Sequence, residues 1–341
     1  MQDSTSCCNN IASFACDHGW SRESFKEKVD LMSHVVVFPG QGSQSVGMLS
    51  DLIERIPSLS QRLDQASNLL GYDLREIVLN GPEDKLNRTD ITQPAVLVTS
   101  IGLWDAVPST LKAQLKAVAG HSLGEWTALV AAGVIRFEDA VRLVSLRGQF
   151  MQQAVETEQT AMAAVLGLDD AGVIAGCREA EQGQCVDPVN FNCPGQVVIA
   201  GHESAVDRAI GILKAKGAKR AIKLAVSVPA HSALMKPAAA KLESEMQAIQ
   251  LHPPTLPVYQ NVSAQAETSP ERIRTNLLMQ LYSTVRWTET ISAMSAAGAT
   301  HYLECGPGKV LTGLVKKIDK VATVEALADG ATWEHLSKEG A

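Results

Sequence analysis

The sequence predicts an α/β protein with a mainly parallel sheet that helices cover on both faces. Short apolar runs alternate with helical patterns along most of the chain, and the first run ends in the glycine-rich loop FPGQGSQ. Such alternation is typical of parallel strands that are buried on both sides. A length of 341 residues is sufficient for a large core with an insertion. The expected core strands are 35–38, 115–119, 257–262 and 301–305.

The middle of the chain departs from this alternation. Its elements follow the order β-α-β-β-α-β, which is typical of a ferredoxin-like unit. We therefore expect a ferredoxin-like subdomain at 156–229, inserted between the core segments 32–155 and 230–341. In chain order, the expected elements of the insertion are strand 161–168, helix 170–182, strands 186–192 and 195–201, helix 204–217 and strand 221–228.

Composition excludes two classes of protein. A net charge of −7 argues against a nucleic-acid binder, because phosphate recognition needs a basic surface. No segment approaches the roughly 18 apolar residues of a membrane span, so we expect no membrane partner. Residues 1–31 are polar, lack a secretory apolar region, and precede Met32; we expect a disordered leader or an upstream mis-start.

The seven cysteines form no CxxC pair and no His–Cys cluster with zinc spacing. We therefore expect no metal site. Without an export signal, reduced thiols in a cytoplasmic enzyme are the default expectation. Cys305 follows an apolar strand and is more typical of a small buried hydrophobic residue than of a nucleophile.

A serine stands between two glycines in the stretch VAGHSLGEWTALVAAG. Residues Gly120, Ser122 and Gly124 fit the pattern G-x-S-x-G, in which a strand-to-helix turn exposes a nucleophile. An apolar helix follows, so N–H groups at its start would face a developing oxyanion. The alternative is that Ser122 is an ordinary helix N-cap. The motif and its context leave both interpretations open.

A serine nucleophile needs a base, usually a histidine. Of the eight histidines, His231 and His301 are the serious candidates, because His121 should point to the other side of the elbow. His231 lies between a strand and a helix beside the expected domain boundary, whereas His301 opens an apolar strand. We favour His231. No acid is indicated as its orienting partner, and a backbone carbonyl could do the same work, so a Ser–His dyad remains possible.

Arg147 falls inside the apolar stripe of a helix that begins near Phe137. A buried guanidinium is costly unless a carboxylate or phosphate pairs with it. Its partner is either an internal Asp or Glu, or the carboxylate of an anionic substrate held by two parallel hydrogen bonds. The residues alone leave both possibilities open.

Six motifs in sequence order resemble the malonyl-CoA:acyl carrier protein transacylases of type II fatty acid synthesis. The resemblance covers residues 35–312, and acyltransferase domains of polyketide synthases share several of the motifs. In that order the motifs are FPGQGSQ, GHSLGE, SLRGQFMQ, VNFNCPGQVVIAG, VSVPAHSALMKP and QLYSTVRW.

The resemblance implies a role for each matching residue. Ser122 would be the nucleophile that carries the acyl ester, and His231 its general base and acid. Arg147 would hold the malonyl carboxylate. The main-chain N–H groups of Gln41 and Leu123 would form the oxyanion hole.

The same resemblance implies that the main-chain carbonyl of Gln280 orients the histidine. It also implies a hydrolase-like α/β core with the ferredoxin-like insertion. Three positions depart from the expected family pattern: Trp126 replaces Tyr, Ala230 replaces Ser beside the base, and position 193 is Cys. We expect Trp126 to change packing only, and Ala230 to affect the selectivity for the acyl group.

The expected reaction is ping-pong transfer of a malonyl group from malonyl-CoA to acyl carrier protein, without a metal or redox cofactor. We expect a monomer. The alternatives are a polyketide synthase acyltransferase acting in trans, or a serine thioesterase. Because acyl carrier protein is acidic, a basic segment is a candidate docking site or simply a solvated surface. Its cations are Lys214, Lys216, Lys219, Arg220 and Lys223.

Overall fold

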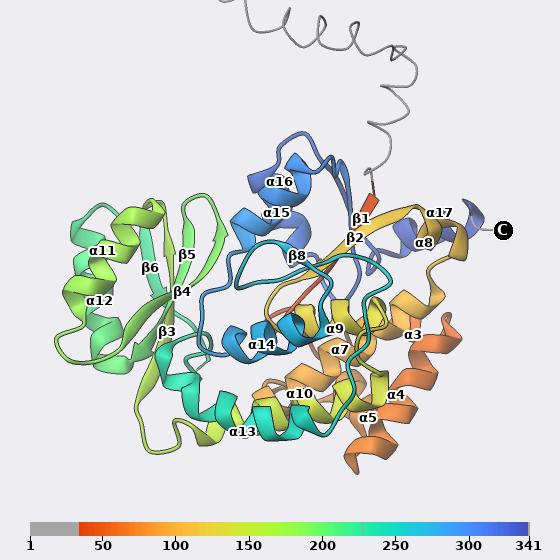
Figure 1. Cartoon of the computed structure of the whole chain (residues 1–341), viewed down its shortest axis with the longest axis horizontal. Coiled ribbons are helices and arrows are strands. Elements are labelled where there is room, and N and C mark those ends of the chain that lie inside the picture. Colours follow the sequence, from red (N-terminus) through yellow and green to blue (C-terminus); the bar gives the residue numbers. More distant parts are fainter. Residues whose placement is uncertain (1–33, 227, 340–341) are drawn as a thin grey trace, which may run out of the picture.

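Two β-sheets organise the chain, and the computed structural model describes residues 34–226 and 228–339 around them (Figure 1). In the core sheet every strand pair is parallel except β7 with β8, which confirms the predicted mainly parallel core. The leader expected at 1–31 lies outside the described residues. The strand order is β10 (Thr323–Ala326), β9 (His301–Glu304), β1 (His34–Phe38), β2 (Leu115–Gly120), β7 (Val258–Tyr259) and β8 (Ala266–Glu267).

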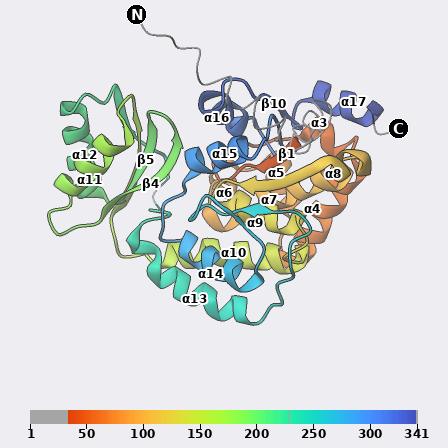
Figure 2. The ribbon, with the colours of Figure 1, turned by 45° about the horizontal axis from the view of Figure 1, so that its top comes forward.

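Successive residues of the central strands are buried on opposite faces of the core sheet. Val36 and Phe38 of β1 enter one apolar cluster, and Val35 and Val37 enter another. Figure 2 shows α15 and α16 on one side of this sheet and the larger helix layer on the other. The helices of the larger layer include α3 (Ser50–Ile53), α4 (Pro57–Leu70), α5 (Leu74–Asn80), α6 (Glu83–Leu86), α7 (Thr89–Ala106), α9 (Leu123–Ala131), α10 (Phe137–Gln153), α13 (Lys236–Gln247) and α14 (Pro270–Gln280).

The remaining helices of the core complete this arrangement. Strands that are covered on both faces read as continuous apolar runs, which is why 35–38 could be recognised as a strand. In the described chain, α17 forms the C-terminal element. The remaining bounds are α8 (Ser109–Gln114), α15 (Trp287–Ala296), α16 (Val310–Ile318), α17 (Gly330–Glu339) and the short 3₁₀ helix Ala233–Met235.

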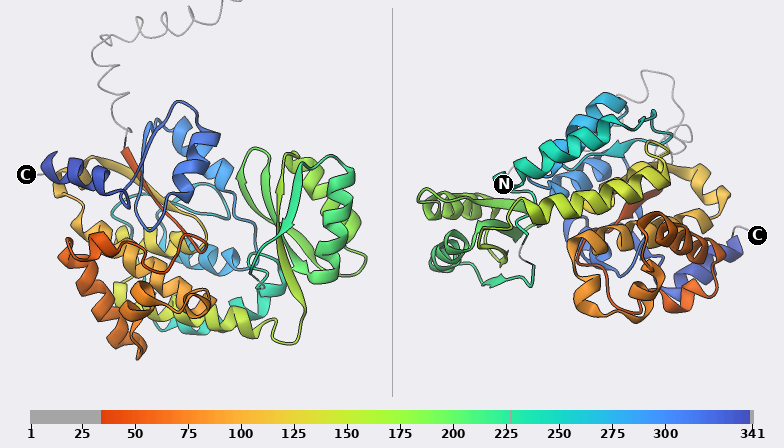
Figure 3. Two further views of the ribbon diagram at one scale, coloured as in Figure 1. Left: turned by 180° about the vertical axis from the view of Figure 1, so that it is seen from behind. Right: turned by 90° about the horizontal axis from the view of Figure 1, so that it is seen from below.

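The second sheet is antiparallel and has the strand order β4-β5-β3-β6, with α11 and α12 on one face (Figure 3). This order confirms the predicted ferredoxin-like fold. We keep 156–229 as the proposed limits of the subdomain, because its first and last strands lie inside them. The elements are β3 (Thr160–Leu166), α11 (Asp170–Ala180), β4 (Val186–Cys193), β5 (Gln196–His202), α12 (Glu203–Ala215) and β6 (Arg220–Lys223).

Two strands, β6 and β7, are much shorter than the sequence predicts. Strand β6 ends at Lys223 rather than at residue 228, and Leu224 and Val226 line a cavity instead. Strand β7 stops at Tyr259 because the chain turns back on itself, with the Ala264 N–H donating to the oxygen of Gln260. The residues beyond the two strands differ in burial: Leu224 and Val226 are exposed and line the cavity, whereas Gln260 and Asn261 are buried in the turn after β7.

The small sheet is hydrogen-bonded directly to the core through Val285. The N–H of Phe191 donates to the Val285 oxygen, and the N–H of Val285 donates to the Val189 oxygen. Strand β4 therefore lies against the segment between α14 and α15, and a cavity forms where the two sheets meet. Within the described residues, no helix is long and apolar enough to span a membrane.

Candidate active site

A cavity of about 570 Å³ lies at the carboxyl ends of β1 and β2, facing the small sheet. Five of the residues expected to act together line it: Gln41, Ser122, Leu123, Arg147 and His231. Ligands of open α/β sheets commonly bind at this end of the strands. The polar groups described below converge on this cavity, which makes it the candidate active site.

Ser122 forms a sharp turn between β2 and α9, with φ 52° and ψ −111°. The flanking glycines are required by close approach, as the pattern predicts. A Cβ on Gly120 would lie 1.9 Å from the main chain of Gly124, and one on Gly124 would lie 2.0 Å from the oxygen of Phe38. Although Ser122 occupies the N-cap position, its side chain makes no capping bond. The Ser122 hydroxyl therefore does not cap α9 and bonds to another group.

The hydroxyl of Ser122 meets His231, with 2.7 Å between Oγ and Nε2. The other ring nitrogen, Nδ1, lies 2.6 Å from the main-chain oxygen of Gln280. Because a carbonyl oxygen only accepts, Nδ1 carries the hydrogen and Nε2 can accept the serine proton. Burial, followed by the nearby charge of Arg147, lowers the pKa of His231 to about 3. The imidazole is therefore neutral at neutral pH.

The competing histidine lies elsewhere. His301 is exposed at the start of β9, and its ring stacks on His34 with 4.8 Å between centroids. His121 points away from the serine hydroxyl, as expected: its Nε2 lies 2.7 Å from Oδ1 of Asn192, and its ring meets Trp287 edge-on. Of the three, only His231 is brought to the nucleophile.

Arg147 of α10 is 2% exposed, and its hydrogen-bond partners are neutral amides. Its Nη1 donates to Oε1 of Gln93 at 2.7 Å, and its Nη2 to Oε1 of Gln280 at 3.1 Å. No carboxylate forms an ion pair with it in the part of the chain that the structure describes. Burial lowers the pKa of Arg147, and the charge of Glu125 opposes that shift. The guanidinium thus faces the cavity without a paired anion.

Glu125, in the first turn of α9, is a buried carboxyl that the sequence analysis did not single out. Its Oε2 accepts from the Asn261 N–H at 3.0 Å and from Nε2 of Gln280 at 2.8 Å. Burial raises the pKa of Glu125 to about 7, while these hydrogen bonds and the charge of Arg147 oppose the rise. An acid in an otherwise apolar helix was the signal that could have found it.

The glycine-rich loop after β1 lies beside the serine turn. A Cβ on Gly40 would lie 2.4 Å from the His121 oxygen, so loop and turn are in contact. The side-chain oxygen of Gln41 accepts from the Thr89 hydroxyl at 2.8 Å. Leu123 is the first residue of α9, and its N–H has no acceptor one turn earlier in the helix. Of the two expected oxyanion residues, Leu123 therefore follows Ser122 directly, and Gln41 lies in the loop that contacts the serine turn.

The basic segment is partly neutralised by neighbouring helices. Lys216 lies 2.9 Å from a carboxylate oxygen of Glu179, and Lys223 lies 2.9 Å from Glu203.

The described residues contain no group of three or more His, Cys, Asp or Glu side chains that could hold a metal ion.

An α/β core with a serine–histidine pair at a strand-to-helix turn defines a serine acyl-transfer enzyme. The chain belongs to the family of acyl transferase domains, whose model matches residues 35–329. The malonyl CoA-acyl carrier protein transacylase of Escherichia coli (strain K12) is 53% identical over 291 residues, which cover 85% of this chain and 94% of the relative. The transacylase of the same name from Bacillus subtilis (strain 168) is 44% identical over 299 residues, with coverage of 87% and 94%.

Solved structures of similar proteins have the same fold. An acyl carrier protein S-malonyltransferase from Vibrio cholerae is 50% identical, covers 89% of this chain and 99% of its own, and gives a TM-score of 0.85. A malonyl-transacylase in complex with a type II PKS acyl-carrier protein is 48% identical, with coverage of 90% and 99% and a TM-score of 0.86.

Proposed function

We propose that this protein transfers a malonyl group from malonyl-CoA to the phosphopantetheine thiol of acyl carrier protein, which supplies the extender unit for fatty acid synthesis. One observation carries the proposal. The Ser122–His231 pair shares a cavity with Arg147, a buried cation whose hydrogen-bond partners are all neutral. A nucleophile and an unpaired guanidinium in one cavity suit an acyl donor that bears a carboxylate. The names of the similar proteins support the same reaction.

In the first half-reaction, the carboxylate of malonyl-CoA binds Arg147 by two parallel hydrogen bonds. Ser122 Oγ attacks the thioester carbonyl while Nε2 of His231 takes its proton. The main-chain N–H groups of Gln41 and Leu123 stabilise the oxyanion of the tetrahedral intermediate. Its collapse breaks the C–S bond, CoA leaves as the thiol with the proton from His231, and a malonyl-serine ester remains.

In the second half-reaction, the phosphopantetheine thiol attacks the malonyl-serine ester. His231 accepts the thiol proton and returns it to Oγ of Ser122 as the ester bond breaks. The carbonyl of Gln280 keeps Nδ1–H in place and stabilises the imidazolium that forms in each step. No step needs an acidic third member of the site, so a Ser–His dyad is sufficient.

We propose that the basic segment docks the carrier protein, with three cations carrying most of the effect. No acid pairs with Lys214, Lys219 or Arg220 in the described part of the chain, whereas Lys216 and Lys223 are already paired. Charge reversal at Lys214 and Arg220 is expected to raise the KM for carrier protein and weaken its salt dependence. Reversal at Lys216 is the matched control, with a smaller effect. An unchanged KM in the double variant contradicts this site.

We further propose that the enzyme acts as a monomer in the cytoplasm. The cysteines of the described residues, Cys177, Cys185, Cys193 and Cys305, are free thiols, which suits a reducing compartment. Light scattering after size-exclusion chromatography tests the monomer, and a stable dimer contradicts it. Subcellular fractionation tests the location.

Intact-mass analysis after brief incubation with malonyl-CoA tests the central proposal. The wild type is expected to gain one malonyl adduct, Ser122→Ala none, and added carrier protein is expected to discharge the adduct as malonyl-carrier protein. Free malonate in place of malonyl-carrier protein would indicate a thioesterase. A wild type without an adduct overturns the proposal.

A further inference from the structure

The side-chain amide of Asn261 is hydrogen-bonded on both sides of the serine turn. Its Oδ1 accepts from the Ser122 N–H at 2.7 Å, and its Nδ2 donates to the Gly120 oxygen at 2.7 Å. Asn261 is fully buried, so bulk water does not compete for either bond. A non-glycine residue with a φ of 52° costs on the order of 1–3 kcal/mol and persists only where its surroundings hold it. The amide of Asn261 is such a restraint on Ser122.

Asn261 is itself fixed by two main-chain hydrogen bonds. Its N–H donates to Oε2 of Glu125 at 3.0 Å, on the helix that the serine turn begins. Its oxygen accepts from the N–H of Arg286 at 3.1 Å, in the segment that leads into α15. Strand β2, helix α9 and this segment therefore meet at one buried residue.

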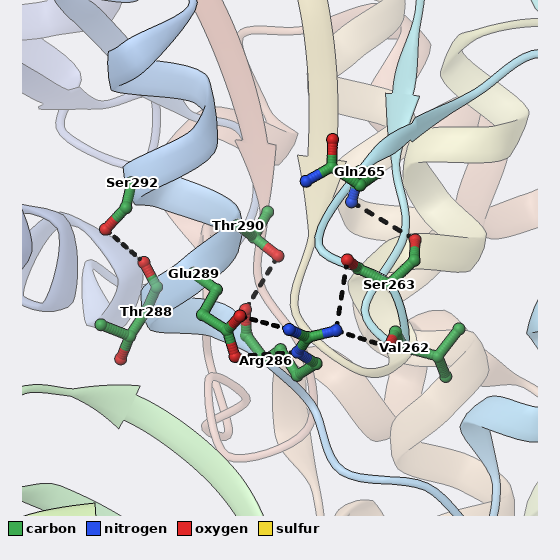
Figure 4. Close-up of polar contacts among 8 residues, drawn as sticks. All are labelled: Val262, Ser263, Gln265, Arg286, Thr288, Glu289, Thr290 and Ser292. Atoms are coloured by element: carbon green, nitrogen blue, oxygen red, sulfur yellow. Dashed lines mark hydrogen bonds and ion pairs between the residues drawn. The ribbon is translucent and has the colours of Figure 1, made fainter.

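Figure 4 shows how the side chain of Arg286 supports the loop that follows Asn261. Its Nη1 donates to the main-chain oxygens of Val262 and Ser263, both at 3.4 Å. Its Nε donates to Oε1 of Glu289 at 2.8 Å, and its Nη2 bonds to the other carboxylate oxygen. Because Glu289 lies in the first turn of α15, the guanidinium ties the loop to that helix. The Arg286 side chain is 39% exposed, so it can be replaced without opening the core.

We propose that Asn261 is a positioning residue for the nucleophile, and that the Arg286–Glu289 pair holds the loop that carries it. The amide bonds keep the turn in the conformation in which Oγ of Ser122 lies 2.7 Å from Nε2 of His231. Asn261 bonds to main-chain groups of the turn and not to the reacting atoms. The proposal rests on the proposed function only for the identity of the acyl donor.

This assignment also bears on the oxyanion hole. The N–H of Ser122 is occupied by Asn261, so it does not stabilise a tetrahedral intermediate. That leaves the N–H of Leu123 as the first group of α9 that can face the oxyanion, together with the N–H of Gln41. Displacing Asn261 would move the nucleophile and this donor together.

The variant Asn261→Ala tests the proposal with two readouts. The first is the rate at which a fluorophosphonate labels Ser122, which does not depend on the acyl donor. The second is the kcat and KM for malonyl-CoA. We expect labelling and kcat to fall by roughly 100-fold, as displacement of a reacting atom does, with little change in KM because the contacts of Arg147 are intact. The control Ser58→Ala loses a hydroxyl bond to the Gly102 oxygen far from the turn, and should label at the wild-type rate.

A second variant, Asn261→Asp, gives a signature that general loss of stability does not produce. As a carboxylate, the new side chain accepts from Ser122 N–H but has no donor for the Gly120 oxygen. When protonated, it restores both bonds. Labelling of this variant should therefore recover as the pH falls from 8 to 5.5, unlike that of the wild type.

Several charged or titratable groups surround this position. Glu125 on α9 accepts from the Asn261 N–H, and the Arg286 N–H donates to the Asn261 oxygen. Arg147 on α10 and His231 both bond to Gln280. His121 lies in the serine turn itself. The same pH profile in a Glu125→Gln background separates the new carboxyl from Glu125. Recovery that disappears in that background overturns the assignment to position 261.

The outcomes distinguish the positioning role from the proposed function. Folded Asn261→Ala that labels at the wild-type rate overturns the positioning role. If that variant does not fold, Arg286→Met decides: labelling roughly tenfold slower supports the role, and an unchanged rate overturns it. Its matched control is Arg272→Met, which removes the ion pair of the exposed Arg272 side chain with Glu267. Normal fluorophosphonate labelling of a wild type that gains no malonyl adduct rejects the proposed function and leaves the role of Asn261 standing.

Discussion

Nδ1 of His231 lies 2.6 Å from the main-chain oxygen of Gln280, in the place where many serine enzymes have a carboxylate. A carbonyl oxygen fixes the tautomer as a carboxylate does, but it adds no negative charge to the site. The side chain of the same Gln280 bonds to Arg147, so the base lies close to a cation that forms no ion pair with a carboxylate of the described residues. The pH dependence of this site should follow from that arrangement.

The first prediction concerns the base. Because burial, and next the charge of Arg147, lower the pKa of His231 to about 3, the imidazole stays neutral well below pH 6.5. The rate of Ser122 modification by a neutral serine reagent should therefore stay flat from pH 8 down to about pH 5, with no half-maximal point near 6.5. Rates measured between pH 4.5 and 8 check this, and an acid limb centred at 6.5 would refute it.

The same shift affects stability. In the unfolded chain His231 takes up a proton near pH 6.5, whereas in the folded protein it does so near pH 3. Above pH 6.5 the imidazole is neutral in both states, so its burial carries no cost of deprotonation. The free energy of unfolding then decreases as the pH falls from 6.5 towards 3. In His231→Gln this part of the acid destabilisation should be absent, which urea unfolding at pH 7 and pH 5 measures.

The second prediction concerns Arg147→Ala. Loss of two charge-assisted hydrogen bonds to the substrate carboxylate should lower kcat/KM for malonyl-CoA by about 100-fold, with a much smaller effect on acetyl-CoA. Removing the cation should also raise the pKa of His231, so the acid limb should move to higher pH. Arg142→Ala, an exposed arginine of the same helix, is the matched control. Retention of full malonyl preference would remove Arg147 from the carboxylate site.

The third prediction concerns Glu125→Gln. The folded pKa of Glu125 is about 7 and its ordinary value 4.5, so the unfolded chain loses this proton first as the pH rises. The cost of burial should grow between pH 4.5 and pH 7 and reach about 3 kcal/mol at pH 8. A glutamine keeps the acceptor for Asn261 and Gln280 without the charge. The variant should therefore exceed the wild type in unfolding free energy at pH 8 and match it at pH 4.5; a gap independent of pH contradicts this.

The fourth prediction concerns the serine turn. In Gly124→Ala the new Cβ would lie 2.0 Å from the Phe38 oxygen, so β1 and α9 must separate. We expect a strong loss of activity and a lower Tm, measured by thermal unfolding. Gly211→Ala in α12 is the control, because a Cβ there meets no atom within 4 Å. That change should be neutral or stabilise by about 0.5–1 kcal/mol, through helix propensity. Equal losses in both variants would argue against the close approach.

The residues that could be predicted from the sequence are those with a local signature. Ser122 stands in a fixed glycine pattern, and Arg147 interrupts an apolar helix stripe. The contacts that complete the site are long-range, so no periodicity reveals them. Gln93 reaches Arg147 from α7, and Asn261 reaches Ser122 from a turn 139 residues later. Gln280 was indicated only by the family resemblance, since a main-chain carbonyl leaves no signature in the residue type.

The ends of the strands could also be predicted only in part from the sequence. An apolar run after a strand favours its continuation, but apolar side chains can also line a cavity outside the sheet. Residues 224–226 line the cavity after β6 ends, which made the predicted strand too long. The sequence likewise indicated that Arg147 needs a partner. It did not indicate which one, because the two amides that bond to Arg147 come from α7 and α14, which are distant from α10 in the sequence.

The hydrogen bonds between β4 and Val285 have a consequence for protein engineering. Val285 lies five residues after Gln280, and the N–H of His231 donates to the oxygen of Leu281 in the same segment. A chimera that exchanges only the inserted ferredoxin-like unit would present a foreign strand edge to this segment and disturb the support of the base. Exchanges between relatives should therefore carry residues 281–288 together with the insertion.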